Sequence, residues 1–502
     1  MWTMWSGFIA VWTVGVFVHG VIRADEVRRP NVLLIVSEDN GLQFGCYGDK
    51  TVPTPHVDRL AASGVRFANA YVTQAVCSPS RSSILTGLYP HQNGQLGLAT
   101  HRFTMVREWP TLPTLLHSAG YRTGLLGKLH VLPESAFQFD VRWADASAIS
   151  FSQRDVHRTA DQVRDFIQGS GEQPFFLMVN FADTHLPFLP QSHGVPSVPV
   201  RPEQVVTMPA VGVDTPRLRR ETADYYSCVQ RLDEGVGLVL SALEQSGQSD
   251  RTLVIFVGDH GPQFARGKVT CYELALKVPL VVRRPGAASA PQVRDELVST
   301  VDLVPTILES AGVAAPANLA GRSLAPLLGA GAPAPPWRDV LFCEWNTSHA
   351  FPLPSLAFPQ RSVRDARYKL IVNLLAGQRN PAEKYYTEQT LVKTGPSQAE
   401  IDAAAPEVQA AYATWRAAPA VELYDLRSDP YEWTNLADKP EFAAVRARLL
   451  TELDAWRRAT QDPLLDADKL GAWLEEHRQQ EGLGRATRPW RYPRYLYGVG
   501  AE

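Results

Sequence analysis

A chain of 502 residues exceeds the roughly 250–300 residues over which one hydrophobic core usually grows, so a large domain with a smaller partner is expected. Hydrophobic residues make up 45% and charged residues 20% of the chain, which excludes a disordered or collagen-like protein. The net charge of -3 provides no basic field for phosphates, so nucleic acid is not expected as a partner.

An apolar run from Phe8 to Ile22 lies near the start of the chain and is followed by Ala24 and a polar stretch. About 15 apolar residues are few for a membrane span, and a small residue at Ala24 suits signal peptidase. We therefore predict that residues 1–24 are a signal peptide and that no stable membrane insertion follows its cleavage. The protein would be exported: periplasmic or secreted, or lysosomal in an animal. An uncleaved membrane anchor is the alternative, because no Lys or Arg precedes the run.

Continuous apolar runs rich in β-branched residues predict buried parallel strands. The predicted strands are Asn31–Val36, Tyr121–Leu126, Phe175–Phe181, Leu253–Gly258 and Val278–Arg283. Helical patterns lie between them, at Thr111–Ala119, Arg154–Gln168 and Arg219–Gln245. This alternation predicts an α/β sandwich with a large, mostly parallel central sheet. Ligands of such folds bind beyond the carboxyl ends of the strands.

A stretch rich in Ala, Pro and Gly at 314–337 predicts the junction between two domains. Beyond it, Tyr368–Asn373 and Val421–Asp425 have strand patterns, and helical patterns continue to about Gln479. We predict a catalytic domain over 25–335 and a smaller α+β domain over 336–502 that closes the substrate pocket.

An odd number of cysteines, five in all, indicates that one thiol of this exported chain has a task other than disulfide pairing. Cys77 opens the segment Cys77-Ser-Pro-Ser-Arg81, which continues to Leu85-Thr-Gly87. A helix that begins at Ser78 would place Cys77 and Arg81 on one face and direct unpaired N–H groups toward an oxyanion. The segment therefore predicts a site for sulfate or phosphate.

This motif resembles that of the sulfatase family, whose cysteine is oxidised to formylglycine by a maturation enzyme. The resemblance implies that one hydroxyl of the aldehyde hydrate attacks sulfur and the other later expels sulfate. It also implies a Ca²⁺ ion, since a hard cation takes oxygen ligands. The implied ligands are Glu38, Asp39, the residue formed from Cys77, Asp259 and His260. Of these, Glu38 and His260 stand where the family more often has aspartate and asparagine.

Other segments at predicted strand ends resemble further sulfatase active-site pieces. Lys128 and Lys268 are expected to bind sulfate oxygens, while His130 and His185 are expected to move protons. Together with Cys77 and Arg81, they form the predicted catalytic set. His349 and Arg361 in the second domain are predicted sugar contacts. An exposed loop with a structural arginine is the equally weighted alternative for that region.

Within the family, the resemblance is greatest to the N-sulfoglucosamine sulfohydrolases. It rests on the segments His91–Gly94, Gly127–Val131, Arg231–Leu240 and Pro359–Val363. It implies hydrolysis of the N-sulfate of glucosamine in heparan-type saccharides. Lys268, where that branch has arginine, and His260 leave open an O-sulfatase acting on another sulfated polysaccharide. The motif is also compatible with a phosphodiester or phosphonate monoester hydrolase of the same superfamily and with a non-catalytic glycan-binding relative. No oligomeric state is predicted.

Overall fold

The structure is a computed structural model that describes residues 1–3, 29–143, 154–286, 291–329, 336–348, 355–388, 392–480 and 489–499. The predicted signal peptide lies outside these ranges except for its first three residues, and His349 lies outside them as well. In the described part of the chain, no helix combines the length and the apolar character that crossing a membrane requires.

The central sheet has eight strands in the order β5-β4-β6-β1-β7-β8-β2-β9. Their bounds are β1 Asn31–Ser37, β2 Val65–Phe67, β4 Arg122–Leu126, β5 Val141–Trp143, β6 Phe175–Phe181, β7 Thr252–Gly258, β8 Leu280–Arg283 and β9 Gln292–Arg294. The neighbours β4, β6, β1 and β7 run parallel, and every residue of β1 and β7 is buried. Burial on both faces explains why these strands are continuous apolar runs rather than alternating ones.

One predicted strand differs from expectation in its direction. The segment predicted at Val278–Arg283 forms β8, which runs antiparallel to both β7 and β2. A parallel connection needs a crossover of a dozen or more residues, usually helical. Between β7 and β8 the chain forms only the four-residue helix α7, Glu273–Leu276, so it turns back beside β7 instead of crossing over.

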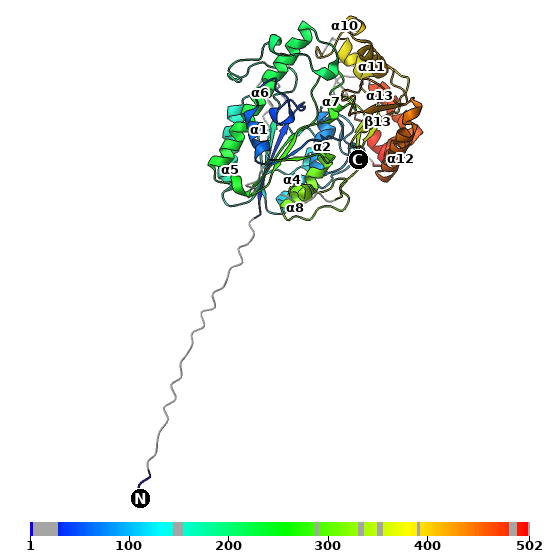
Figure 1. Cartoon of the computed structure of the whole chain (residues 1–502). Helices are drawn as coiled ribbons and strands as arrows, with labels where there is room; N and C mark the ends of the chain where they lie inside the picture. Colours follow the sequence, from blue (N-terminus) through cyan, green and yellow to red (C-terminus); the bar gives the residue numbers. More distant parts are fainter. Residues whose placement is uncertain are drawn as a thin grey trace.

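Helices cover both faces of the sheet, as Figure 1 shows. One layer holds α1 (Pro55–Ala62), α5 (Val156–Ser170) and α6 (Pro216–Gln245), and the other holds α2 (Cys77–Thr86), α4 (Leu112–Ser118) and α8 (Leu303–Ser310). The long helix α6 begins after Thr215, whose side chain caps the Leu218 N–H, and its apolar stripe is buried. The predicted α/β sandwich is confirmed.

A smaller antiparallel sheet lies beside the first, in the yellow-to-red part of Figure 1. Its strands, in order, are β11 (Leu341–Trp345), β12 (Gln360–Arg364), β13 (Tyr368–Asn373) and β14 (Val421–Asp425). The helices around it are α9 (Pro381–Thr387), α10 (Gln398–Asp402), α11 (Pro406–Arg416), α12 (Ala443–Ala459), α13 (Ala467–Gln480) and α14 (Tyr492–Tyr497). The predicted small α+β domain is confirmed, while its boundary at 335/336 stays a prediction.

Candidate active site

The sheet order brings most of the predicted site residues to one edge. Glu38 and Asp39 follow β1, and Asp259 follows its neighbour β7; Lys128 follows β4, and His185 follows β6. Because β4, β6, β1 and β7 are adjacent and parallel, their carboxyl ends deliver these side chains to the same place. The backbone N–H of Asp39 donates to Asp259 Oδ1 at 3.0 Å, which ties the two central strand ends together.

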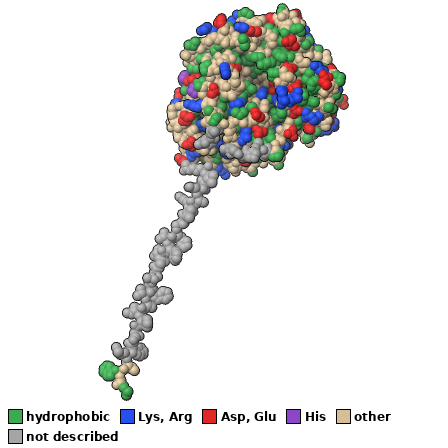
Figure 2. Space-filling view, viewed as in Figure 1, with side chains coloured by type: hydrophobic (Ala, Val, Ile, Leu, Met, Phe, Trp, Pro, Cys, Tyr) green, Lys and Arg blue, Asp and Glu red, His purple; other side chains and the backbone are tan. Residues whose placement is uncertain are grey.

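The charge at this edge is buried rather than displayed. Figure 2 shows acidic and basic side chains intermingled over the visible surface. At the strand ends, by contrast, Glu38, Asp39 and Asp259 are 0% exposed, and Lys128 and Lys268 are each 7% exposed. Buried charges must be paired or bound to a ligand, so this concentration marks a site.

Cys77 is the first residue of α2 and is 2% exposed. Lys268 Nζ lies 3.7 Å and His260 Nε2 lies 3.5 Å from its Sγ atom. Burial alone would raise the pKa of the thiol, but Lys128, Lys268 and hydrogen bonds from His130 and His185 hold that pKa well below its ordinary value. The Cys77 sulfur is free, and it lies where a helix N-terminus and two ammonium groups favour negative charge.

Arg81 lies behind Cys77 and joins four strand ends. Its Nε donates to Asp259 Oδ2 at 3.1 Å, and its Nη1 donates to the Lys128 carbonyl at 3.0 Å and to Asn180 Oδ1 at 2.6 Å. Its Nη2 lies 3.4 Å from Glu38 Oε1. Asn180 was not predicted. Its signal is a lone amide near the end of the otherwise apolar strand β6.

Two buried ion pairs hold the lysines. Lys268 Nζ donates to both oxygens of Asp39, at 2.8 and 3.0 Å, and Lys128 pairs with Glu38. Burial would raise the pKa of Glu38, but Lys128 and Arg81 lower it to about 2. Burial would lower the pKa of Lys268, but Asp39 and Cys77 raise it. Both ammonium groups therefore stay charged beside Cys77.

The histidines are oriented by backbone carbonyls. His260 Nδ1 lies 2.9 Å from the Gly261 carbonyl, and His185 Nδ1 lies 2.6 Å from the Leu186 carbonyl. A carbonyl only accepts, so Nδ1 carries the proton and Nε2 faces the site. His260 Nε2 is 3.2 Å from Asp39 Oδ1. Burial lowers the pKa of His260, but Asp259 and Asp39 raise it to about 9, whereas burial and Lys128 lower the pKa of His130 to about 4.

The donor set fits a divalent cation. Ligand atoms of Asp39, Cys77 and His185, and likewise of Cys77, Asp259 and His260, lie within 4.8 Å of one another. Glu38 Oε2 is buried and, among the described residues, has no hydrogen-bond partner. Three buried carboxylates, one with an unpaired oxygen, match the oxygen preference of a hard cation.

The predicted sugar contact Arg361 lies elsewhere and is corrected by the structure. It is 0% exposed, and its Nε and Nη2 donate to Asp462 at 2.8 and 2.9 Å, while its Nη1 donates to Asn346 at 3.0 Å. A guanidinium that is fully buried and held by a carboxylate inside the protein is out of reach of a sugar. Arg361 is therefore a structural arginine of the second domain.

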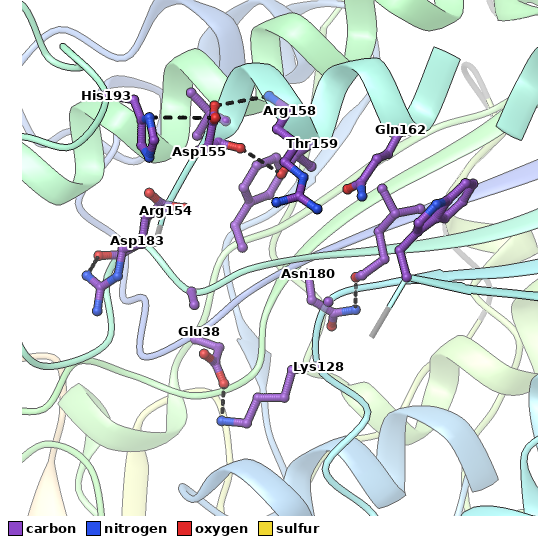
Figure 3. A pocket seen from close by; sticks show the side chains of 16 residues that line it. Glu38, Lys128, Arg154, Asp155, Arg158, Thr159, Gln162, Asn180, Asp183 and His193 are labelled. Carbon is purple, nitrogen blue, oxygen red and sulfur yellow. Dashed lines mark hydrogen bonds and ion pairs between the residues drawn. The ribbon is translucent and has the colours of Figure 1, made fainter. Parts of the chain in front are cut away.

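A cavity of about 160 Å³ lies beside the Glu38–Lys128 pair, as Figure 3 shows. It extends between the ends of β4 and β6 and the first turns of α5, with Trp143, Gln162 and Asn180 in its wall. Cys77 is not among its lining residues. The cavity therefore adjoins the charged side chains around Cys77, here called the catalytic cluster, without containing the Cys77 sulfur.

Comparison with known proteins places the fold and the site in a family. The model of the sulfatase family matches residues 30–313, and the model described as "N-sulphoglucosamine sulphohydrolase, C-terminal" matches residues 258–380. The chain belongs to the sulfatase family. Sulfatases generally use formylglycine and a divalent metal, and they are hydrolases of sulfated compounds.

Individual relatives include enzymes of sulfated glycans. The human N-sulphoglucosamine sulphohydrolase is 33% identical over 89% of this chain and 93% of its own length. An ulvan-active sulfatase of Formosa agariphila is 29% identical over 87% of this chain and 82% of its own length. A solved structure described as a complex with "its substrate D-Glucosamine-2-N, 6-O-disulfate" covers 86% of this chain and 98% of its own, with a TM-score of 0.64 and 21% identity, which supports the fold.

Proposed function

We propose that this sulfatase removes the N-sulfate of glucosamine in heparan-type saccharides, with formylglycine formed from Cys77 by a maturation enzyme. The convergence on one sulfur atom carries the proposal. The Cys77 Sγ lies within 3.7 Å of Lys268 Nζ and 3.5 Å of His260 Nε2, at the N-terminus of a buried helix. In this structure, Sγ stands in for an oxygen of formylglycine, which would be bonded to Cβ of this residue.

Formylglycine supplies the nucleophile toward sulfur once its aldehyde is hydrated. The residues around it then have separate tasks. Lys128 and Lys268 keep their charge and can bind sulfate oxygens, where they would stabilise charge that develops in the transition state. His130, whose pKa is lowered, is neutral at physiological pH and can accept a proton from the nucleophile. His185 presents Nε2 to the site and, once Nε2 is protonated as well, can protonate the leaving nitrogen.

Glu38, Asp39, Asp259 and His260 would hold the proposed Ca²⁺ ion, together with the residue formed from Cys77; His260 would bind through Nε2 in its neutral form. Bound there, the cation would polarise a sulfate oxygen as a Lewis acid. Calorimetric titration with Ca²⁺ tests these ligands directly. Asp259→Asn is expected to weaken Ca²⁺ binding and to lose activity that high calcium partly restores. Full activity in the presence of a chelator would contradict the metal assignment.

Sulfate release identifies the substrate. The enzyme is offered N-sulfated glucosamine, 6-O-sulfated glucosamine, nitrophenyl sulfate and a phosphate diester in separate assays, and the mass of the Cys77 peptide is measured in the same preparation. Release from the N-sulfated sugar and a mass of formylglycine are expected. Release only from the O-sulfated sugar would favour an O-sulfatase, and hydrolysis of the diester alone would favour a phosphodiester or phosphonate monoester hydrolase.

Export after removal of residues 1–24 is part of the same proposal and is tested by N-terminal sequencing of the mature protein.

A further inference from the structure

The C-terminal domain reaches the catalytic cluster through α9. The Tyr386 hydroxyl donates to the Lys268 carbonyl at 3.1 Å, and the Tyr385 hydroxyl accepts from Gln263 Nε2 at 2.9 Å. Two successive tyrosines therefore contact the segment that carries the catalytic Lys268. Their environments differ, because Tyr386 is 0% exposed and Tyr385 is partly exposed.

The direction of each hydrogen bond around Gln263 follows from Lys268. An ammonium group only donates, so Gln263 faces Lys268 Nζ with its carbonyl oxygen, at 3.5 Å. The Gln263 amide nitrogen then faces Tyr385 and donates to it. The Tyr385 hydroxyl is thus used as an acceptor and keeps its own proton. Within the described residues, no acceptor lies within hydrogen-bond distance of that O–H, although a tyrosine hydroxyl near a protein interior usually has a partner.

The loop between Gln263 and Lys268 is tightly constrained. Its backbone holds Arg266 at φ 64°, and a Cβ on Gly267 would lie 2.3 Å from the Pro262 carbonyl; directly after Lys268, the β-branched Val269 is held at φ 71°. Left-handed conformations of this kind persist only where the surroundings enforce them, and they cluster at functional sites. This segment therefore fixes the backbone positions from which the Gln263 and Lys268 side chains project, and Gln263 links Lys268 to Tyr385.

We propose that Tyr385 is a specificity-determining residue whose O–H donates a hydrogen bond to an oxygen of the saccharide while Lys268 holds its sulfate group. The inference rests on the proposed sulfatase activity toward a sugar. It assigns to the C-terminal domain the sugar contact that the buried Arg361 cannot make. The partner must be an acceptor, such as a hydroxyl or carboxylate oxygen, because the group left unused beside the bond from Gln263 is the O–H donor.

Tyr385→Phe keeps the ring and removes only the hydroxyl. Losing one hydrogen bond to the sugar is expected to lower kcat/KM for N-sulfated glucosamine roughly 10-fold, mostly through KM. Nitrophenyl sulfate lacks the sugar and cannot make this hydrogen bond. Its turnover by Tyr385→Phe should therefore stay within about twofold of that by the parent enzyme, which is less than the loss of one hydrogen bond produces. Tyr412→Phe is the matched control. Tyr412 belongs to the same domain as Tyr385, but its buried hydroxyl already donates to the Val211 carbonyl at 2.9 Å, so turnover of neither substrate should change.

A purely positional role predicts a different pattern. If Tyr385 acted only by holding Gln263 against Lys268, then Tyr385→Phe and Gln263→Ala would reduce hydrolysis of nitrophenyl sulfate and of the sugar by the same factor, and that result would overturn the inference. Calorimetry in the Cys77→Ser background separates binding from turnover. There, Tyr385→Phe should weaken N-sulfated glucosamine and leave inorganic sulfate unchanged. Equal affinity of the sugar for both proteins would also overturn the inference, whereas failure of the proposed function would appear as no sulfate release by the parent enzyme.

Discussion

Two regions of this chain bury charged side chains, but only one of the two gathers them around a reactive atom. In the C-terminal region, Asp462 accepts from Arg361, from Arg457 Nε at 2.7 Å and from the Leu464 N–H at 3.0 Å. At the strand ends, Glu38 keeps a buried oxygen without a partner in the described structure, and several charged groups converge on the Cys77 sulfur. Burial of charge is therefore a poor guide to function by itself. Incomplete pairing and convergence on one reactive atom are what distinguish the catalytic cluster.

The sharpest test of this comparison is removal of the atom on which the cluster converges. Cys77→Ala should abolish turnover of nitrophenyl sulfate, and Cys77→Ser should nearly do so, because an ordinary hydroxyl lacks the second oxygen needed to expel sulfate. The free energy of unfolding should fall little in Cys77→Ser, since the side chain is similar in size. Near-normal multiple turnover by Cys77→Ser would refute the formylglycine mechanism.

Replacement of a proton donor should have a smaller and more selective effect. Loss of a general acid typically lowers a rate by about 10²–10⁴. His185→Ala should lower turnover of N-sulfated glucosamine by that factor, because an amine leaves only when protonated. The activated leaving group of nitrophenyl sulfate needs no proton, so its turnover should fall far less. Equal losses on both substrates would show that His185 positions Lys268, which lies 3.5 Å from it, rather than donating a proton.

The sequence predicts the catalytic cluster better than its surroundings, for a physical reason. Parallel strands leave a local signal, a buried apolar run followed at once by a charged residue, and this signal located Asp39 and Asp259. Contacts that depend on packing between domains leave no such signal: Gln263 meets Tyr385 only because α9 packs against the segment that carries Lys268. Arg361 shows the converse, since the sequence predicted a sugar contact there and gave no sign of its partner Asp462, which lies far away along the chain.

In the C-terminal region around Arg361 and Asp462, the expected effect of a substitution is on stability rather than on turnover. Asp462→Ala removes the carboxylate that is hydrogen-bonded to Arg361 and leaves Glu344, 3.7 Å away, as the remaining counter-charge. Breaking a buried ion pair typically costs about 3–5 kcal/mol. Urea unfolding should show this loss, while kcat of the folded fraction on nitrophenyl sulfate stays unchanged. Asp454→Ala is the control, because its pair with Arg458 has side chains 50% and 71% exposed and should contribute less than about 1 kcal/mol. A large fall in kcat for Asp462→Ala would contradict this prediction, because it would show that the C-terminal ion pair also takes part in turnover.

The smallest expected effect is a change in the pH dependence of stability at Glu273, which joins α7 to the small sheet. Burial would raise the pKa of Glu273, but Arg364 and Lys369 lower it from 4.5 to about 2. Above pH 4.5 the carboxylate is charged in both the folded and the unfolded state, and its contribution to the free energy of unfolding is constant. As the pH falls toward about 2, the unfolded chain binds a proton while the folded protein does not, and this contribution is lost. The difference in unfolding free energy between the parent protein and Glu273→Gln should therefore be greatest above pH 4.5 and shrink on acidification. Glu475→Gln, at an exposed pair with Arg478, serves as the control and should change the pH profile far less, because solvent screens that pair. A Glu273→Gln difference that does not vary with pH would mean that the ion pairs of Glu273 do not favour its charged form.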